Sequence, residues 1–334
     1  MSVVGYSLKT RTDIKAKIPQ DNLGDSQTLK KGNNQVPKEN NSTLPDQLGM
    51  ATRIGIFENQ SPEWHAIRAT GIGGSDIAAI CRTSPWTSPF ALWAKKTGRI
   101  EDTVGTSEAA EWGTILEPVI LEQFEKRSGL KLHKDVGTWA NNERPWQLAN
   151  PDAIWEKDGK FGIVEVKTSR YEDDWANGVP AYYKTQVQWY SQTFGFDTTI
   201  YVVALFAGSK FKVYEIDSDP FEMETNLVEV EKFRTYLEND TQPDFDGALS
   251  TYQTVRELHP EIDPAQEVEL GDLWVHASNA LEEEKKASAK ATEMKARILD
   301  ALGKAKKGVY DGELVATRQS RGGGTPFLQI KKGA

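Results

Sequence analysis

The sequence predicts an α/β (α+β) fold in which helices flank a central mixed β-sheet. Two apolar runs rich in β-branched and aromatic residues, 198–206 and 211–216, are typical of strands. The segment 180–194 before them has helical character and starts at Pro180, a favoured position for proline at the beginning of a helix. Because strands are expected on both sides of this helix, a mixed sheet covered by helices is the simplest architecture.

An earlier segment, 107–127, has an apolar stripe of helical period and predicts a second helix. Glu117 lies in this segment among apolar residues that we expect to be mostly core, namely Trp112, Ile115, Leu116, Val119 and Ile120. Pro118 follows it and should either kink the helix or cost it about 3 kcal/mol. Glu117 is therefore either a helix-capping residue beside a kink or a carboxylate that belongs to a functional site.

The segment 150–169, NPDAIWEKDGKFGIVEVKTS, predicts a β-hairpin, because Asp158-Gly159 is a strong signal for a two-residue turn. This turn pairs Lys157 with Lys160, Ile154 with Ile163 and Asp152 with Glu165. Strand alternation then divides the side chains between two faces. One face carries Asp152, Ile154, Ile163, Glu165 and Lys167, and the other carries Trp155, Val164 and Val166.

The composition is that of a soluble globular protein, with 38% hydrophobic and 27% charged residues. No apolar run approaches the roughly 18 residues that a membrane span needs, and the N-terminus has no signal-peptide pattern. A single cysteine, Cys81, excludes an intrachain disulfide and a cysteine-ligated metal cluster within one chain. We expect a cytoplasmic protein, and the family resemblance described below places it in a bacterial host cell. The net charge of −9 excludes bulk coating of nucleic acid but allows a local basic groove.

Four regions are predicted along the chain. Residues 1–50 are polar and lack a periodic apolar face, so we expect a disordered tail. Residues 51–247 should form the folded core. Residues 248–303 should be a helical extension, with a charged helix over about 264–302, and residues 304–334 a basic hairpin or tail. This end of the chain is either a DNA, subunit or partner contact, or a solvated helix with a frayed tail.

Asp152 and Glu165 would face each other across the hairpin, with their β-carbons about 5 Å apart, where like charges repel. Lys167 supplies one compensating charge, and a divalent cation would supply the rest. Carboxylate ligands without histidine or cysteine favour Mg²⁺, with Mn²⁺ as a substitute, over zinc. The alternative is a hairpin whose acidic face is simply solvated.

Two further motifs carry polar residues at helix positions. In GIGGSDIAAI, residues 71–80, the glycines allow a tight turn, and Ser75 or Asp76 can cap the helix that follows. Gln186 and Tyr190 are four residues apart and share one face of the predicted helix 180–194. Gln188 competes with Gln186 for any role at that face.

Four segments in order resemble the lambda exonuclease or YqaJ-type viral recombinase family of the PD-(D/E)XK nuclease superfamily. They are EWHAIRATGIGGSDIAAI (63–80), WGTILEPVILEQF (112–124), PDAIW with EVK (151–155 and 165–167), and WANGVPAYYKTQVQWY (175–190). The resemblance implies a restriction-endonuclease-like core. It implies that Asp152, Glu165, Lys167, Glu117, Gln186 and Tyr190 are catalytic, and that Asp152, Glu165, Glu117 and the Val166 carbonyl hold Mg²⁺.

The resemblance further implies that Arg68 and Ser75 grip the 5′-phosphate of a DNA end. Arg170 is near the position of a second phosphate-gripping arginine, although its spacing differs. The implied activity is 5′→3′ degradation of linear double-stranded DNA, which leaves 3′ single-stranded overhangs for a phage single-strand annealing protein. The implied assembly is a homo-oligomeric ring of three or four subunits around DNA.

Rival functions fit the same residues less well. A catalytically silent DNA-end-binding or assembly module on the same fold would leave the joint presence of Asp152, Glu165 and Lys167 unexplained. A glycoside hydrolase also uses two carboxylates but keeps one of them protonated, which an adjacent lysine opposes. A Cas4-like nuclease would need a cysteine cluster.

Overall fold

The computed structural model describes residues 44–101 and 107–331. The described chain divides into two compact units, one ending at Pro260 and one beginning at Glu261. The expected disordered tail, apart from residues 44–50, lies outside the described residues, as do the last three residues of the expected basic tail. Leu44 and Leu48 are buried, so ordered packing already begins seven residues before the predicted boundary at residue 51.

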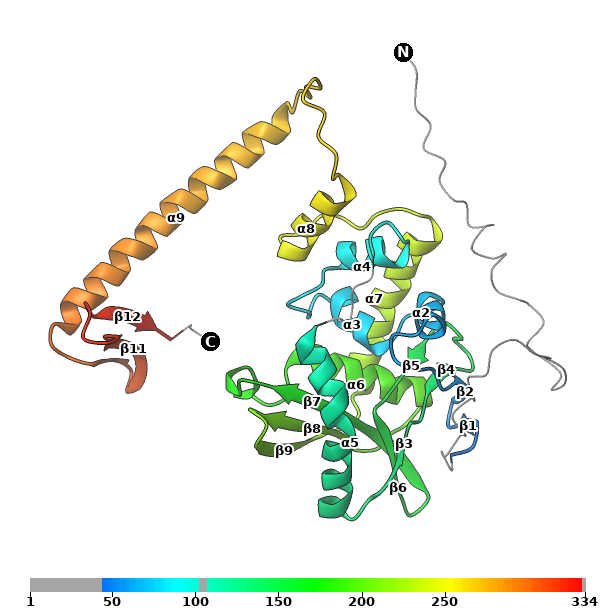
Figure 1. The fold of residues 1–334 in the computed structure, drawn as a ribbon. Helices are drawn as coiled ribbons and strands as arrows, with labels where there is room; N and C mark the ends of the chain where they lie inside the picture. The colour runs from blue at the N-terminus through cyan, green and yellow to red at the C-terminus, as the bar shows by residue number, and fades with distance from the viewer. Residues whose placement is uncertain (1–43, 102–106, 332–334) are drawn as a thin grey trace. The chain divides into compact units, whose positions relative to one another are not determined.

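The first unit is built on a five-stranded mixed sheet in the order β3-β6-β7-β8-β9 (Figure 1). Strands β7 and β8 are parallel, and all other neighbours in this sheet are antiparallel. The helix α6, Ala181–Phe194, connects the two parallel strands, as a parallel crossover requires. The strands are Lys131–Lys134 (β3), Ala153–Lys157 (β6), Lys160–Ser169 (β7), Ile200–Phe206 (β8) and Lys210–Ile216 (β9). The predicted mixed sheet with flanking helices is confirmed.

Helices cover both faces of this sheet, and the alternation of the hairpin side chains decides which residues reach each face. Ile154 and Ile163 join the larger core on the side of α6, whereas Trp155, Val164 and Val166 pack with α5 on the other. The other elements of this unit are α2 (Pro62–Ala69), α3 (Gly74–Ile80), α4 (Pro89–Lys96), α5 (Glu108–Ser128), a 3₁₀ turn (Asp173–Trp175), α7 (Pro220–Glu238) and α8 (Leu249–Leu258). A small sheet, in the order β1-β2-β4-β5, contains Gln47–Leu48, Ala51–Gly55, Thr138–Asn141 and Leu148–Ala149.

The hairpin register is as predicted, with Lys157 opposite Lys160 and Ile154 opposite Ile163. The ladder ends at the pair Ala153–Val164, however, one pair before Asp152 and Glu165. Asp152 lies just outside β6, and its Oδ2 accepts a hydrogen bond of 2.7 Å from the backbone N–H of Val166. The aspartate therefore joins the sheet through its side chain instead of its backbone.

Helix α5 agrees with the predicted helix but not with its expected burial. Ile120, Leu121 and Phe124 are buried, whereas Trp112, Ile115 and Val119 are each more than half exposed. The prediction that these three residues belong to the core was wrong, because a helical stripe shows that an apolar face exists and not that another element covers it. The helix runs on through Pro118, which lies inside it.

The second unit contains a long helix, α9 (Asp272–Leu302), and a three-stranded antiparallel sheet in the order β10-β11-β12. Its strands are Lys307–Tyr310, Glu313–Gln319 and Phe327–Ile330. No residue of α9 is buried. The division at residue 260 falls inside the predicted extension 248–303, because α8 packs with the first unit through contacts such as Thr251 to Ser88, 2.7 Å. Among the described residues, no helix combines the length and the apolar character needed to cross a membrane.

Candidate active site

The end of strand β7 brings two predicted residues directly together. Nζ of Lys167 donates a hydrogen bond of 2.7 Å to Oε1 of Glu165. The same Oε1 accepts a second hydrogen bond of 2.7 Å from Nε2 of Gln186 on α6. Glu165 is 3% exposed, so the sheet and the helix hold its carboxylate in a fixed place.

The other oxygen of Glu165 is in a different situation. Oε2 is buried and, within the described part of the chain, has no hydrogen-bond partner. A buried carboxylate oxygen without a partner is costly unless a ligand supplies the missing positive charge. Glu165 therefore has one oxygen held by protein donors and one available to a cation.

Two more carboxylates face this group. Burial, and after it the negative charge of Glu165, together raise the pKa of Glu117 to about 7, although Lys167 opposes this shift. Burial, Glu165 and Glu117 together raise the pKa of Asp152 well above its usual value. Asp152, Glu165 and Glu117 thus form a group of three mutually repelling carboxylates, which we call the acidic cluster, with Lys167 as its cation.

Lys167 remains protonated in this setting. Burial lowers its pKa, but Glu165 and Asp152 outweigh burial and hold the pKa above its usual value. The ammonium also lies 4.7 Å from the ring centre of Tyr183 on α6, a distance typical of a cation–π contact. Lys167 is therefore a fixed positive charge between the carboxylates and the aromatic ring.

The donor set suits a hard divalent cation such as Mg²⁺ or Mn²⁺. Carboxylate oxygens of Asp152, Glu165 and Glu117 and the carbonyl of Val166 are ligands that such ions prefer, and the partnerless Oε2 of Glu165 is the opening for one. Within the described residues no three acidic, histidine or cysteine side chains already stand in the arrangement of a preformed metal site. Binding would therefore draw the carboxylates together.

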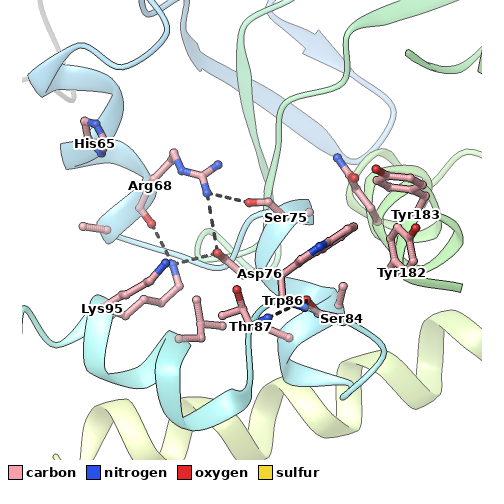
Figure 2. Close-up of a pocket in the computed structure, with 17 residues that line it drawn as sticks. His65, Arg68, Ser75, Asp76, Ser84, Trp86, Thr87, Lys95, Tyr182 and Tyr183 are labelled. Atoms are coloured by element: carbon pink, nitrogen blue, oxygen red, sulfur yellow. Dashed lines mark hydrogen bonds and ion pairs between the residues drawn. The ribbon is translucent and has the colours of Figure 1, made fainter. Parts of the chain in front are cut away.

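A second charged group lies at the start of α3. Nη2 of Arg68, on α2, donates a hydrogen bond of 2.7 Å to Oγ of Ser75 and lies 3.8 Å from Oδ1 of Asp76 (Figure 2). Nζ of Lys96, on α4, lies 2.8 Å from Oδ2 of Asp76. We call Arg68, Ser75, Asp76 and Lys96 the basic cluster, because it contains two cations and one carboxylate.

The carboxylate of this cluster also organises the turn. Asp76 accepts a hydrogen bond of 2.9 Å from the backbone N–H of Gly73 and so caps α3. Burial would raise its pKa, but Lys96 and Arg68 outweigh burial and hold the pKa below its usual value. Of the two predicted capping candidates, Asp76 takes that task, and the hydroxyl of Ser75 is left to meet Arg68.

Tyr190 connects the two clusters. Its hydroxyl accepts a hydrogen bond of 3.0 Å from Nε2 of Gln186, which also holds Glu165. Its ring lies against Gly74 so closely that a β-carbon there would be 2.3 Å from the ring. Glycine is thus required at residue 74 because the tyrosine occupies the space of a side chain.

The two remaining predicted residues, Gln188 and Arg170, belong to neither cluster. Gln188, the rival of Gln186, is fully buried and binds the backbone of Asp217 and Asp219, so its role is structural. Arg170 is exposed with its guanidinium 5.5 Å from the ring centre of Tyr171, and it does not line the cavity described below. A phosphate-gripping role for Arg170 stays a prediction.

Sequence reasoning missed Lys96 and Tyr183, which complete the two clusters. Lys96 lies in none of the four segments that carry the family resemblance, whereas Tyr183 lies in the segment 175–190 but was given no role there. The position of Tyr183 on the face of α6 next to Gln186, three residues on, was the available signal.

Comparison with known proteins places these residues in a family. Residues 63–197 match the model of the YqaJ-like viral recombinase domain. The protein YqaJ of Bacillus subtilis is 31% identical over 218 residues, which cover 64% of this chain and 68% of that protein. A protein of African swine fever virus is 29% identical over 171 residues, covering 42% of this chain and 48% of the viral protein. Among solved structures, an alkaline exonuclease from Laribacter hongkongensis aligns with a TM-score of 0.44 and 16% identity, over 60% of this chain and 100% of that one.

Proposed function

The chain belongs to the YqaJ-like viral recombinase family, and we propose that it is a Mg²⁺-dependent exodeoxyribonuclease that degrades linear double-stranded DNA from its 5′ ends. The observation that carries the proposal is the acidic cluster with Lys167, in which a buried carboxylate oxygen of Glu165 has no partner within the described residues. Because this site lacks positive charge, a divalent cation would fit it. The bound cation, together with Lys167, would in turn attract a phosphodiester.

The residues divide the work of hydrolysis among them. Asp152, Glu165, Glu117 and the Val166 carbonyl would hold the metal, whose chemistry is to acidify a bound water and to stabilise charge on the leaving oxygen. Lys167, held protonated by its neighbours, would stabilise the negative charge that develops on the phosphorus oxygens. Gln186 fixes the orientation of Glu165, and Tyr190 fixes Gln186.

The basic cluster supports the choice of a 5′ end. Arg68 and Lys96 share one carboxylate, Asp76, so one positive charge is left for an incoming anion. Arg68 and the hydroxyl of Ser75 offer donors of the kind that bind a terminal phosphate. Gln186 and Tyr190 link this cluster to the acidic one, which would set the distance from the terminal phosphate to the bond that is cut.

Such an enzyme would leave 3′ single-stranded overhangs, the form of DNA that a phage single-strand annealing protein needs. We further propose assembly into a trimeric or tetrameric ring, which would keep an acidic chain on DNA by enclosure instead of by bulk charge.

The test uses linear duplex DNA labelled separately at its 5′ and 3′ ends. It is incubated with wild-type protein in Mg²⁺ or in EDTA, beside Lys167→Ala and a control, Lys160→Ala, at an exposed lysine on the same strand. Early loss of the 5′ label that needs Mg²⁺, persists in the control and disappears in Lys167→Ala is expected. Intact DNA in all samples, with ends still bound in a gel-shift assay, would contradict the nuclease and leave a DNA-end-binding module.

A further inference from the structure

A cavity of about 370 Å³ opens beside the basic cluster. Arg68 and Ser75 line one part of it, Gln186 lines another, and Trp86, Tyr182 and Tyr183 form an aromatic wall (Figure 2). The volume suits one small ligand and not a duplex. The cavity therefore offers an anion-binding end, a polar contact with the acidic cluster and aromatic surfaces in one space.

Trp86 is the most accessible part of the wall. It lies in the loop between α3 and α4 and is 62% exposed. Its ring meets that of Tyr182 edge to face, with centroids 4.8 Å apart at 73°. Much of the indole surface is thus free although one side is supported.

The loop that carries Trp86 is held by its own hydrogen bonds. The hydroxyl of Ser84 accepts from the backbone N–H of Trp86, 3.2 Å, and from that of Thr87, 3.1 Å. An aromatic side chain on such a fixed loop loses little conformational entropy when it contacts a ligand. The indole of Trp86 is therefore pre-organised to stack on a flat ligand.

The wall also reaches the acidic cluster. Tyr182 and Tyr183 are adjacent in the first turn of α6, with ring centroids 4.4 Å apart, and Tyr183 lies under the ammonium of Lys167. A flat ligand on Trp86 would thus be connected through two rings to the lysine of the proposed catalytic site.

We propose that Trp86, supported by Tyr182, is a stacking surface for an unpaired nucleobase at the 5′ end of the DNA strand whose terminal phosphate meets Arg68 and Ser75. The proposal rests on the proposed function. A base inside a duplex has both faces covered by its neighbours, so only a base that has left the stack can offer one to an indole. The strand end must therefore enter the cavity unpaired.

Stacking of this kind is tolerant of sequence, because every base has an aromatic face. The chemistry suits an enzyme that advances through any sequence, and it makes the separation of the terminal base pair part of substrate binding. Terminal mismatches should then bind more tightly than matched ends, since the unpairing has already occurred.

The test measures binding in EDTA, so that hydrolysis plays no part. The probe is a 5′-phosphorylated duplex with 2-aminopurine as its 5′-terminal base, and the variants are Trp86→Ala, Trp86→Phe and a control, Phe221→Ala, at an aromatic residue that is 81% exposed on α7. Wild type, Trp86→Phe and the control should quench the 2-aminopurine fluorescence. Trp86→Ala should lose the quenching and bind about 5- to 150-fold more weakly.

A second duplex, with an abasic site in place of the terminal base, completes the cycle. Wild type should bind it as weakly as Trp86→Ala binds the intact end, and Trp86→Ala should lose nothing more. Equal quenching and equal affinity for wild type and Trp86→Ala, with binding still sensitive to Arg68→Ala, would overturn the stacking surface and leave the proposed function intact. Failure of the wild type to bind any DNA end would overturn both.

Discussion

The acidic and basic clusters differ in the sign of the charge that each lacks. The acidic cluster has three carboxylates, Asp152, Glu165 and Glu117, and one cation, Lys167. The basic cluster has two cations, Arg68 and Lys96, and one carboxylate, Asp76. The pKa values of Glu117 and Asp152 are raised, whereas that of Asp76 is lowered.

The acidic cluster therefore lacks a cation, and the basic cluster lacks an anion. Asp76 is stabilised in its charged form by Lys96 and Arg68, and one of the two positive charges of the basic cluster is left for an anion. Glu117 and Asp152 are destabilised as anions by the residues around them, so the acidic cluster still lacks a compensating positive charge. A metal and a phosphate group together would supply what both clusters lack.

The largest effect should come from removing the carboxylate at the centre of the acidic cluster. Glu165→Gln should lower the rate of DNA hydrolysis by about 10²–10³-fold or more, the effect of removing one group that stabilises the transition state. Glu156→Gln is the matched control, since this glutamate lies on the same hairpin but pairs with Lys131 and His133. The rate at which each variant hydrolyses one labelled duplex provides the measurement. Equal losses of rate in the two variants would contradict a specific role of Glu165 in hydrolysis.

Asp76→Asn should destabilise the fold by about 3 kcal/mol at pH 7, because it leaves Lys96 with a side chain only 10% exposed and no carboxylate partner. The lowered folded pKa of Asp76 means that its stabilisation is fully present above the ordinary value of 3.8 and is lost as pH falls through the folded value. Denaturant unfolding should show the gap between wild type and variant narrowing below pH 3.8. A gap that widens there would show that the carboxylate is not held as an anion.

The basic cluster should control the discrimination between DNA ends. Wild type should prefer a 5′-phosphorylated end to a 5′-hydroxyl end by about tenfold or more, the range of a charge-assisted hydrogen bond to phosphate. Arg68→Ala should remove the preference, whereas Arg82→Ala, at an exposed arginine paired with Asp246, should keep it. If the preference survives in Arg68→Ala, another cation binds the terminal phosphate.

The smallest effect concerns Glu117 in the absence of metal. Its folded pKa of about 7 lies above the ordinary value of 4.5, so its contribution to stability falls as pH rises from about 4.5 through 7. In EDTA, Glu117→Gln should therefore be more stable than wild type by about 1–2 kcal/mol at pH 8 and show little advantage at pH 4. Thermal unfolding at both pH values provides the measurement, and a variant less stable than wild type at pH 8 would contradict the repulsion.

Local features of the fold followed from the sequence more readily than the sites did. The turn at Asp158-Gly159 and the period of two fixed the hairpin register, because both act over a few residues. The place of Asp152 outside the ladder depended on a side-chain bond to Val166, which alternation cannot reveal. The long helix α9 begins at Asp272, eight residues later than predicted, directly after its capping residue Gly271.

The two clusters show where prediction from sequence ended. Glu165 and Lys167 share a strand face, and Gln186 and Tyr190 share a helix face, so each pair could be predicted from local periodicity. Lys96 meets Asp76 only because α4 packs beside α3, and the packing of separate helices is not written in any short motif. The exposed stripe Trp112, Ile115 and Val119 failed as a core prediction for the same reason.

The most direct test of the central claim, that the acidic cluster lacks a cation, is the thermal unfolding of wild type and Glu165→Gln at pH 8 as Mg²⁺ is titrated from an EDTA baseline. The wild-type midpoint should rise with Mg²⁺, by the equivalent of about 2.7 kcal/mol when the ion reaches a hundred times its dissociation constant, and the Glu165→Gln midpoint should stay constant. Equal shifts in both proteins, or none in the wild type, would contradict a metal site at Glu165.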